Sequence, residues 1–424
     1  MPERLYYAEP FLTSFPSRVS DIREVSRTQG QTLWQIALDR TAFYPVSGGQ
    51  PYDTGVLRAT APSGATLNAP ILAVEEDEKG EIWHTTQKPL LAGTAVQGEI
   101  DWRRRRDHMQ QHSGQHLLSA VFHRETGAPT ISFHLGEMTS TIDLAVDGVS
   151  PEELERVENA VNEKIAEDLQ VRMRTVPRSD AETLLANGEL RKLPEREGAI
   201  RLIEIEGVDL NACGGTHVRS TGQIGALLIR GTERVSKGVR IEFVCGLRAW
   251  QAAHADFSIL RRAAQALTVG RLQLPEAVDR LLAENKAGHK KQQKLCEELV
   301  DYQVARLAVE EPIEGGLRLV HREFADHDAT YIKLLASRLT ASLPQTCVLL
   351  ASTAQEPARV VVASSRDLAI DCNAALRDAL AQFGARGGGS PQMAQGQIAG
   401  GLLQELLSGL AEALRAHRQP AAPA

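Results

Sequence analysis

The chain has 424 residues, of which 42% are apolar and 24% are charged, with a formal net charge of −7. This length and composition predict a folded protein of several domains and exclude a disordered chain. Its apolar runs fall short of the roughly 18 residues that a membrane-spanning helix needs, so no membrane association is expected. The start of the chain lacks the pattern of a secretory signal and the five cysteines are scattered, which predicts a cytoplasmic protein.

The acidic net charge excludes attraction of polyanions by the whole molecule, so contacts with nucleic acid require local basic surface. Three groups of basic residues are candidates: Arg103 to Arg106; Arg230, Arg234, Lys237 and Arg240; and Lys286, Lys290, Lys291 and Lys294. Each group is also compatible with a solvent-exposed face or a set of ion pairs. Only the neighbouring residues can decide between these interpretations.

The fold class predicted is a multidomain α+β protein. Residues 1–100 alternate short apolar segments such as TLWQIAL with turn signals such as SGGQPYDTG, which predicts hairpins in a small β-barrel. Residues 101–248 begin with a helix from Asp101 to Thr126, where Gly127 gives a stop signal. Strands then alternate with a second helix, which Ser150 and Pro151 begin and which ends at about Leu169. This segment is predicted to be an α+β domain.

The rest of the chain is predicted to hold a helical arm and a last domain. Residues 249–311 consist mainly of helix-forming residues and predict a linker or arm. Residues 312–424 alternate strand-like and helical stretches, which predicts a separate α/β domain. The arm and this domain together offer a surface through which the chain could form a homodimer.

Two short pairs of residues predict a metal site. His112 and His116 lie four positions apart in the first predicted helix, so both imidazoles project from one face. Cys213 and His217 are also four apart, with glycines between them that let the backbone fold closely round a centre. Three imidazoles and one thiolate suit tetrahedral zinc, and we expect one zinc ion per chain. His108 offers a competing pair with His112 and is predicted to lie at the mouth of the site or in solvent.

Several motifs resemble one known family. The segments FYPVSGGQPYDTG (43–55), HSGQH (112–116), ACGGTH (212–217) and RIEFVCG (240–246) together resemble the editing domain of alanyl-tRNA synthetase, and most of all its free-standing relatives, the AlaX-type editing proteins. The segment ARGGGSPQMAQG resembles the glycine-rich signature of the DHHA1 domain that closes the synthetase and the long AlaX form. The resemblance spans almost the whole chain, with the motifs in the order that the family has.

The resemblance implies trans-editing of tRNA(Ala): hydrolysis of the ester that joins wrongly attached serine or glycine to the RNA, without amino-acid activation. The ligand count presents a difficulty, because four protein ligands are typical of structural zinc, whereas hydrolytic zinc keeps an open position. We expect an open or expandable site, in which Cys213 is loose or the metal gains a fifth partner.

Recognition of serine requires a polar group that meets its hydroxyl. Gln115, in the position just before the second histidine of the family motif, is one candidate; Ser132 and His134, which alternate on one face of the next predicted strand, are others. Each of the three could equally make a structural hydrogen bond.

Two glycine-rich segments could contact the substrate. Gly48, Gly49, Gln50 and Asp53 could shape the pocket or touch the RNA end, or could only form tight barrel turns. Gly387, Gly388 and Gly389 could form a turn, or a loop whose amides approach a phosphate.

Two alternative functions stay open. The editing domain of threonyl-tRNA synthetase carries similar ligand pairs, so the substrate could be a different tRNA. A tRNA-binding module with structural zinc and no hydrolysis would also keep all four ligands.

Overall fold

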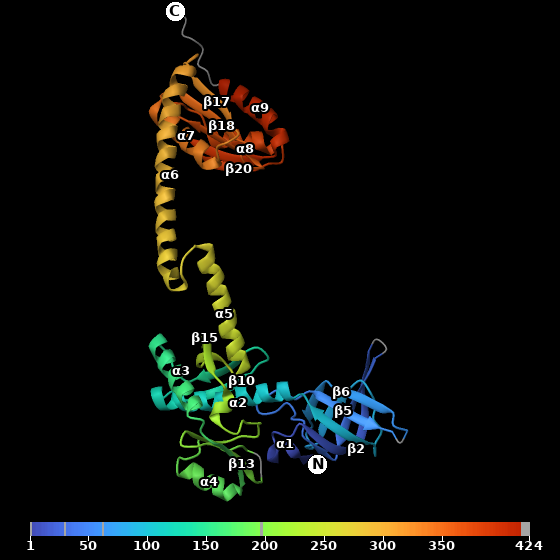
Figure 1. Cartoon of the computed structure of the whole chain (residues 1–424). Coiled ribbons are helices and arrows are strands. Elements are labelled where there is room, and N and C mark those ends of the chain that lie inside the picture. Colours follow the sequence, from blue (N-terminus) through green and yellow to red (C-terminus); the bar gives the residue numbers. More distant parts are fainter. Residues whose placement is uncertain (1, 29–30, 62, 196–197, 417–424) are drawn as a thin grey trace, which may run out of the picture. The chain divides into compact units, whose positions relative to one another are not determined.

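The structure is a computed structural model that describes residues 2–28, 31–61, 63–195 and 198–416. The chain forms two compact units, the first ending at Arg262 and the second beginning at Ala263 (Figure 1). Among the described helices, none is long and apolar enough to cross a membrane. The finer division into four domains stays a prediction.

The first unit opens with a seven-stranded antiparallel sheet, in which the strands follow the order β6-β5-β9-β2-β3-β8-β7. Alternate side chains of each strand point to one face, so Leu57 and Ala59 of β5 join Ile36 and Leu38 of β3 in one apolar core. The strands are β2 (Ser14–Thr28), β3 (Gln31–Leu38), β5 (Gly55–Thr60), β6 (Thr66–Ile71), β7 (Ala73–Glu76), β8 (Ile82–Thr86) and β9 (Ala95–Ile100). The short elements β1 (Glu3–Arg4), α1 (Leu5–Ala8) and β4 (Arg40–Thr41) lie beside it.

The prediction of a closed barrel is wrong. The edge strands β6 and β7 each pair with one neighbour, and no strand pairing between them is found in the described part of the chain. Only Leu72 separates β6 from β7, and its amide donates to the carbonyl of Thr85, 2.8 Å away. The two edge strands are therefore consecutive in the chain, but no ladder between them closes a barrel in the described residues.

The long helix α2 (Trp102–Thr126) confirms the helix that was predicted from the sequence. Asp101 caps its start by accepting a hydrogen bond from the amide of Arg104, and Gly127 ends it in a left-handed conformation. Apolar residues of α2, including Leu117 and Phe122, form a core with the four-stranded sheet β10-β11-β16-β15. The bounds of these strands are β10 (Thr130–Leu135), β11 (Ser140–Leu144), β15 (Leu227–Val235) and β16 (Gly238–Cys245).

A smaller layer completes the first unit. Helix α3 (Pro151–Ala166) begins with the predicted cap at Ser150, whose side chain and that of Glu153 bond each other's backbone amides. The helix ends at Ala166, three residues before the predicted end. A three-stranded sheet follows, with the order β12-β13-β14. The remaining elements are β12 (Val171–Val176), α4 (Arg178–Ala186), β13 (Ile200–Ile205), β14 (Asp209–Ala212) and the short η1 (Thr221–Ile224).

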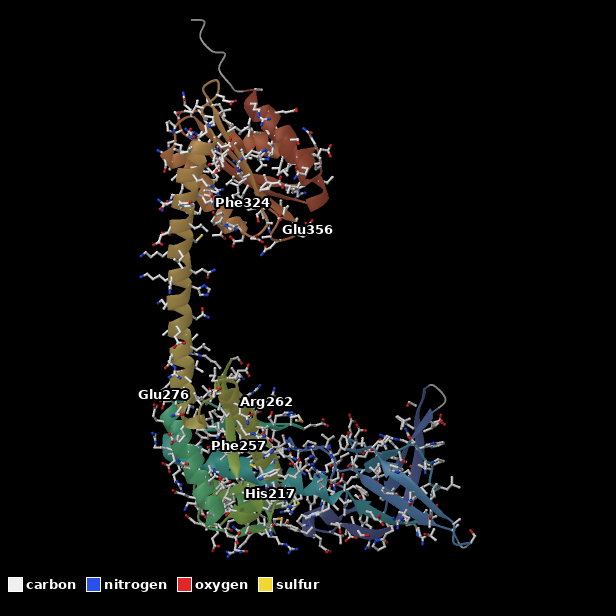
Figure 2. The ribbon with its side chains drawn as sticks, turned by 45° about the horizontal axis from the view of Figure 1, so that its top comes forward. His217, Phe257, Arg262, Glu276, Phe324 and Glu356 are labelled. Atoms are coloured by element: carbon white, nitrogen blue, oxygen red, sulfur yellow. The ribbon has the colours of Figure 1, made fainter. Side chains whose placement is uncertain are left out.

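Helices fill the segment that was predicted to be an arm. They are α5 (Leu247–Ala266), the short η2 (Arg271–Gln273) and α6 (Leu274–Glu310). The last part of α6 packs into the core of the second unit through Val300 and Leu307. The middle of α6 exposes its side chains on all sides (Figure 2).

The second unit is a three-layer α/β domain, as predicted for its sequence. Its five-stranded sheet has the order β17-β18-β19-β21-β20, with β17 and β18 parallel. Strand β18 is buried on both faces: Leu349 packs with α8 and α9, whereas Leu350 packs with α6 and α7 (Figure 1). The elements are β17 (Arg318–Phe324), α7 (Ala329–Ser342), β18 (Thr346–Ser352), β19 (Ala358–Ser364), α8 (Cys372–Ala381), β20 (Gly387–Ser390), β21 (Met393–Ile398), η3 (Gly400–Leu402) and α9 (Leu403–Arg415).

Candidate metal centre

The structure brings together the four residues that were predicted to bind a metal. One ligand atom from each of His112, His116, Cys213 and His217 lies within 4.8 Å of the other three. Helix α2 supplies the first two residues, and the loop after β14 supplies the others; His217 is labelled in Figure 2. The three histidines are buried, whereas Cys213 is half-buried.

Gln50 fixes the orientation of His112. Its Oε1 accepts a hydrogen bond from the amide of Thr216 at 3.0 Å and lies 2.8 Å from Nδ1 of His112. Since the atom that faces the Thr216 amide must be an acceptor, Nδ1 of His112 carries the proton and donates to it. The other nitrogen, Nε2, is then the one that a neutral His112 offers to a metal, and it lies 3.4 Å from the sulfur of Cys213.

The other two histidines are held in the same way. Nδ1 of His217 lies 3.1 Å from Oγ of Ser113, and its Nε2 lies 3.3 Å from the sulfur of Cys213. Nδ1 of His116 lies 3.5 Å from a carboxylate oxygen of Asp209. Partners of this kind on the outer ring nitrogen set the tautomer and the ring orientation of metal-binding histidines.

The loop that carries Cys213 can approach helix α2 because residue 215 is glycine. A Cβ atom at Gly215 would lie 2.1 Å from Cε1 of His112, so any other residue would push the loop away. The guanidinium of Arg201 donates to the carbonyl oxygens of Cys213 and Gly215, at 2.9 and 2.8 Å. Arg201 is buried, so it holds this turn from inside the unit.

The electrostatics of the cluster suit a cation. Burial alone would raise the pKa of Cys213. The opposing effect of His112 and His217 is larger, so the pKa lies well below its ordinary value. Burial, together with the nearby His112, lowers the pKa of His217 to about 3. Burial also lowers the pKa of His116, but Asp209 and Cys213 outweigh it and raise the pKa to about 9. The cluster therefore offers a thiolate and a neutral imidazole, which are the forms that bind metals.

The distances also fit zinc. Tetrahedral zinc with bonds of about 2.0 Å to nitrogen and 2.3 Å to sulfur places its ligand atoms about 3.3–3.8 Å apart. The sulfur of Cys213 lies 3.4 and 3.3 Å from the ring nitrogens of His112 and His217. These two distances match tetrahedral zinc, and the four ligand atoms together lie within 4.8 Å of one another. The donor set of three imidazoles and one thiolate also suits zinc.

Comparison with known proteins agrees with this geometry. Residues 200–242 match the threonyl and alanyl tRNA synthetase second additional domain, and residues 316–416 match the DHHA1 domain. The alanyl-tRNA editing protein Aarsd1 of Bos taurus is 34% identical over 327 residues, which cover 76% of this chain and 71% of the relative. The Aarsd1 protein of Rattus norvegicus is 31% identical over 343 residues, and 80% of each chain is covered. The chain belongs to the alanyl-tRNA editing protein family.

The chain is also similar to alanine–tRNA ligases. The ligase of Pyrococcus abyssi is 34% identical over 411 residues, which cover 93% of this chain. The chain spans 42% of the length of that ligase and 32% of the ligase of Pyrococcus furiosus.

Two predicted site residues of this editing-family protein are not brought to the metal centre. Ser132 donates to Asp143 at 2.6 Å on the exposed face of β10, and His134 is exposed on the same face. Phe133, which alternates with them, lies on the other face, with its ring 5.7 Å from that of His112. The apolar face of β10 packs against α2, and α2 carries the cluster, so the polar face turns to solvent.

Gln115 lies beside the ligands in α2 and is buried. Its Nε2 donates to Oγ of Ser119 at 2.9 Å. Its Oε1 is buried and has no hydrogen-bond partner among the described residues. This acceptor belongs to the residue that precedes His116 in the chain, and a substrate donor could satisfy it.

The first glycine-rich segment has mixed roles. Gly48 and Gly49, both with positive φ, form the tight turn between Ser47 and Gln50. A Cβ at Gly49 would lie 2.6 Å from the ring of Phe133, so this turn packs against β10. Asp53 is fully buried in an ion pair with Arg105, away from solvent. Gln50 thus reaches the metal centre, whereas Asp53 fixes the turn to α2.

The second glycine-rich segment is a strand in the structure, where a turn or a loop was predicted. Gly387, Gly388 and Gly389 form the edge strand β20, which pairs with β21. A Cβ at Gly387 would lie 2.5 Å from Leu380 of α8, and one at Gly389 would lie 2.2 Å from the carbonyl oxygen of Met393. The glycines therefore allow close packing, and nothing in this geometry singles out a phosphate.

Two further expectations need correction. His108 was predicted to lie at the mouth of the site or in solvent, but it is buried, and this burial lowers its pKa to about 3. The Arg103 to Arg106 group was considered as a basic surface, but two of its four arginines do not point freely into solvent. Arg105 is fully buried, and Arg104 donates a hydrogen bond to the carbonyl of Tyr52 at 2.9 Å. Arg103 and Arg106 are exposed.

The sequence did not reveal the outer partners of the histidines. Ser113 and Asp209 were not singled out, although Ser113 lies inside HSGQH and Asp209 shortly before ACGGTH. Their positions inside or just before the ligand motifs are the feature of the sequence from which they could have been predicted. Gln50 was expected to contact the substrate, but it contacts His112.

Proposed function

We propose that this chain is a zinc-dependent aminoacyl-tRNA deacylase that hydrolyses the ester of tRNA(Ala) mischarged with serine or glycine. The observation that carries the proposal is the cluster of His112, His116, Cys213 and His217, with an outer partner on each histidine, in a chain of the alanyl-tRNA editing protein family. His112, His116, Cys213 and His217 would hold one zinc ion. A zinc ion bound there would supply Lewis acidity for the ester carbonyl.

The chain's own residues prepare the site for this chemistry. Gln50, Ser113 and Asp209 hold the three imidazoles, so their ring positions need not change during the reaction. The ring of Phe133 lies beside that of His112, with centroids 5.7 Å apart, and would limit the access of water from that side. The histidine side of the proposed site is therefore held in place and shielded from water, and the substrate would approach from one remaining direction.

That direction lies on the side of Cys213. The three histidine ligands are buried, and only Cys213 is partly exposed. An incoming ester therefore meets the cluster at Cys213, which supports an open or expandable site over a closed structural one.

Selection of serine is assigned to Gln115. Its buried Oε1 lacks a partner among the described residues, so a serine hydroxyl that donates to it would satisfy it. Alanine offers no such hydroxyl and would leave the acceptor unpaired. Glycine also lacks a hydroxyl and would leave the same acceptor unpaired, so its release would rest on its smaller volume compared with alanine.

The test is a deacylation assay with Ser-tRNA(Ala), Gly-tRNA(Ala), Ala-tRNA(Ala) and Ser-tRNA(Thr). We expect rapid release from the first two, loss of activity after chelation, and recovery with zinc. His116→Ala should lose both bound zinc and activity. Release from Ala-tRNA(Ala) at the same rate as from Ser-tRNA(Ala) would contradict the proposal.

Two observations favour alternatives that the same assay separates. The domain matched by residues 200–242 occurs in threonyl as well as alanyl tRNA synthetases, so release from Ser-tRNA(Thr) alone would assign a different tRNA. Four protein ligands suit structural zinc, so a tRNA-binding module would bind RNA with no turnover. For such a module, Gln115→Leu would have no activity to lose.

A homodimer through the helical arm and the last domain remains a proposal. The exposed side chains of Leu295, Leu299 and Tyr302 on α6 support it. Sedimentation of the wild type beside Leu299→Glu tests it, and a monomeric wild type at micromolar concentration would count against it.

A further inference from the structure

A cavity of about 240 Å³ opens near the start of helix α2, apart from the metal centre. Its lining comes from the segment after α1, from α2 and from the loop after His217: Phe11, Trp102, Arg106, Met109, Val218, Arg219 and Gln223. The volume is below the roughly 300–1,000 Å³ of pockets that enclose a whole small molecule. The cavity therefore suits one flat group of a larger ligand.

The cavity adjoins the metal centre through two continuous segments. Trp102, Met109 and His116 are seven positions apart from one to the next, so they follow one stripe of α2 with little drift. At 1.5 Å per residue, Met109 lies about 10 Å along the helix axis from His116. Val218 follows the ligand His217 directly. The cavity and the metal centre are thus built on the same helix and the same loop.

Flat groups of the cavity offer stacking surfaces. The rings of Phe11 and Trp102 have centroids 5.8 Å apart and an interplanar angle of 50°. The guanidinium carbon of Arg219 lies 4.1 Å from the centroid of Phe11, so this contact holds the cation in place. Unpaired bases of RNA stack on aromatic rings and on guanidinium planes of this kind.

The two arginines that line the cavity carry positive charge that no described acidic residue pairs with. Arg106 and Arg219 are exposed, and neither side chain makes an ion pair with a described residue. By contrast, Arg248 and Arg230 in the same unit are paired with Asp107 and Asp256. Unpaired arginines beside stacking surfaces fit a nucleotide, whose phosphate is anionic and whose base is flat.

We propose that this cavity binds one unpaired nucleotide of an RNA strand, with its base against Trp102 and Phe11 and its phosphate at Arg106 and Arg219. The inference rests on the proposed function in one respect, since the strand would be the single-stranded end of the tRNA whose ester reaches the metal centre. It adds a nucleotide-binding site between that centre and the body of the RNA.

The test is fluorescence anisotropy of a short, labelled, single-stranded RNA with the full, zinc-loaded chain. Trp102→Leu keeps an apolar side chain against the core and should weaken binding about five- to a hundredfold, because one base loses its stacking partner. Arg106→Ala should lower the slope of log affinity against log salt by about 0.7, the share of one phosphate contact on a single strand. Unchanged binding by both variants would overturn the proposal.

Matched variants separate a site from a diffuse basic surface. Arg103 is exposed on the same helix, has no ion pair among the described residues and lies outside the cavity lining. Arg103→Ala should change the affinity much less than Arg106→Ala, and Trp250→Leu on α5 should not change it. Equal effects of Arg103→Ala and Arg106→Ala would overturn the proposal. So would an equal loss of heparin binding by Trp102→Leu, since heparin has charge but no bases.

This outcome is distinguishable from failure of the proposed function, because the RNA carries no ester. RNA binding that depends on Trp102 without release from Ser-tRNA(Ala) would contradict the deacylase and leave the nucleotide site. Release from Ser-tRNA(Ala), together with RNA binding that Trp102→Leu does not change, would support the deacylase and contradict the nucleotide site. Zinc content and circular dichroism of Trp102→Leu check that the variant is folded.

Discussion

Gln50 connects the first sheet to the metal centre through a single side chain. It accepts hydrogen bonds from the Thr216 amide and from Nδ1 of His112, and its Nε2 donates to Oγ1 of Thr216. We predict that Gln50→Ala lowers zinc affinity about 10- to 100-fold, as loss of a histidine's outer partner does. Competition with a chromogenic chelator measures this. Gln97→Ala, which removes only a bond to Ser14, is the control; equal zinc affinities of the two variants would contradict the role of Gln50.

His84 gives the first unit a dependence on pH. Burial lowers the pKa of His84 from 6.5 to about 4, although the bond from Nδ1 to the carbonyl of Ile36 partly offsets it. Because the pKa is lower in the folded state, the unfolded chain binds the extra proton first as the pH falls. The free energy of unfolding therefore keeps this contribution above pH 6.5 and loses it toward pH 4, by about 3 kcal/mol.

Urea unfolding between pH 7 and 4 measures the effect, with His84→Gln for comparison. The variant can still donate to the Ile36 carbonyl but does not titrate, so its stability should fall less steeply. Parallel pH curves for the two proteins would show that His84 contributes nothing.

At the level of elements, helix α2 could be predicted because its signals are local. A cap at Asp101, a glycine at 127 and helical spacing of His112 and His116 all lie within the helix or beside it. The two ligand pairs were found for the same reason. The outer partners were not, because Gln50 lies 62 positions from His112 and Ser113 lies 104 from His217. Only the fold brings such residues together.

The errors at this level also have physical causes. Closing a barrel depends on the pairing of edge strands, which alternation of apolar residues does not specify. For β10, alternation identified the two faces correctly, but the polar face was assigned to the site. The cluster instead lies behind the apolar face, where Phe133 contacts His112. Gly387, Gly388 and Gly389 were predicted to form a turn or a loop, yet they lie in strand β20. A Cβ at Gly387 would meet Leu380 of α8, and one at Gly389 would meet the carbonyl oxygen of Met393 in β21.

Gly114 determines how closely α2 approaches β16. A Cβ at Gly114 would lie 2.3 Å from the sulfur of Cys245. We predict that Gly114→Ala destabilises the unit by about 1–3 kcal/mol through overpacking, although alanine favours helices. Chemical denaturation measures the change.

The matched control is Gly288→Ala in α6, where the new Cβ meets no atom within 4 Å. This substitution should stabilise the protein by about 0.5–1 kcal/mol, because only the helix preference remains. The double variant Gly114→Ala/Cys245→Ala should recover part of the loss. Equal stability changes at Gly114 and Gly288 would contradict a steric contact at Cys245.

At the scale of the whole molecule, the described apolar cores do not cross the boundary between the units. The cores around Leu117 and Leu57 draw on residues of the first unit, and those around Leu349 and Leu350 draw on residues of the second. All four proposed metal ligands belong to the first unit. Folding and metal binding of the first unit should therefore not require the second.

A fragment of residues 1–269, which ends after α5, tests this division. We predict that it keeps about one zinc per chain and the kcat of the full chain on Ser-tRNA(Ala), because the metal centre is intact. Its KM should rise about a hundredfold if the second unit grips the same tRNA, since two linked weak contacts bind more tightly than either alone. Residues 270–424 added as a separate fragment should not restore the KM, because the gain requires the covalent link. An unchanged KM would show that the second unit does not contribute to binding of this substrate, and a fragment without zinc would show that the first unit depends on the second for its fold.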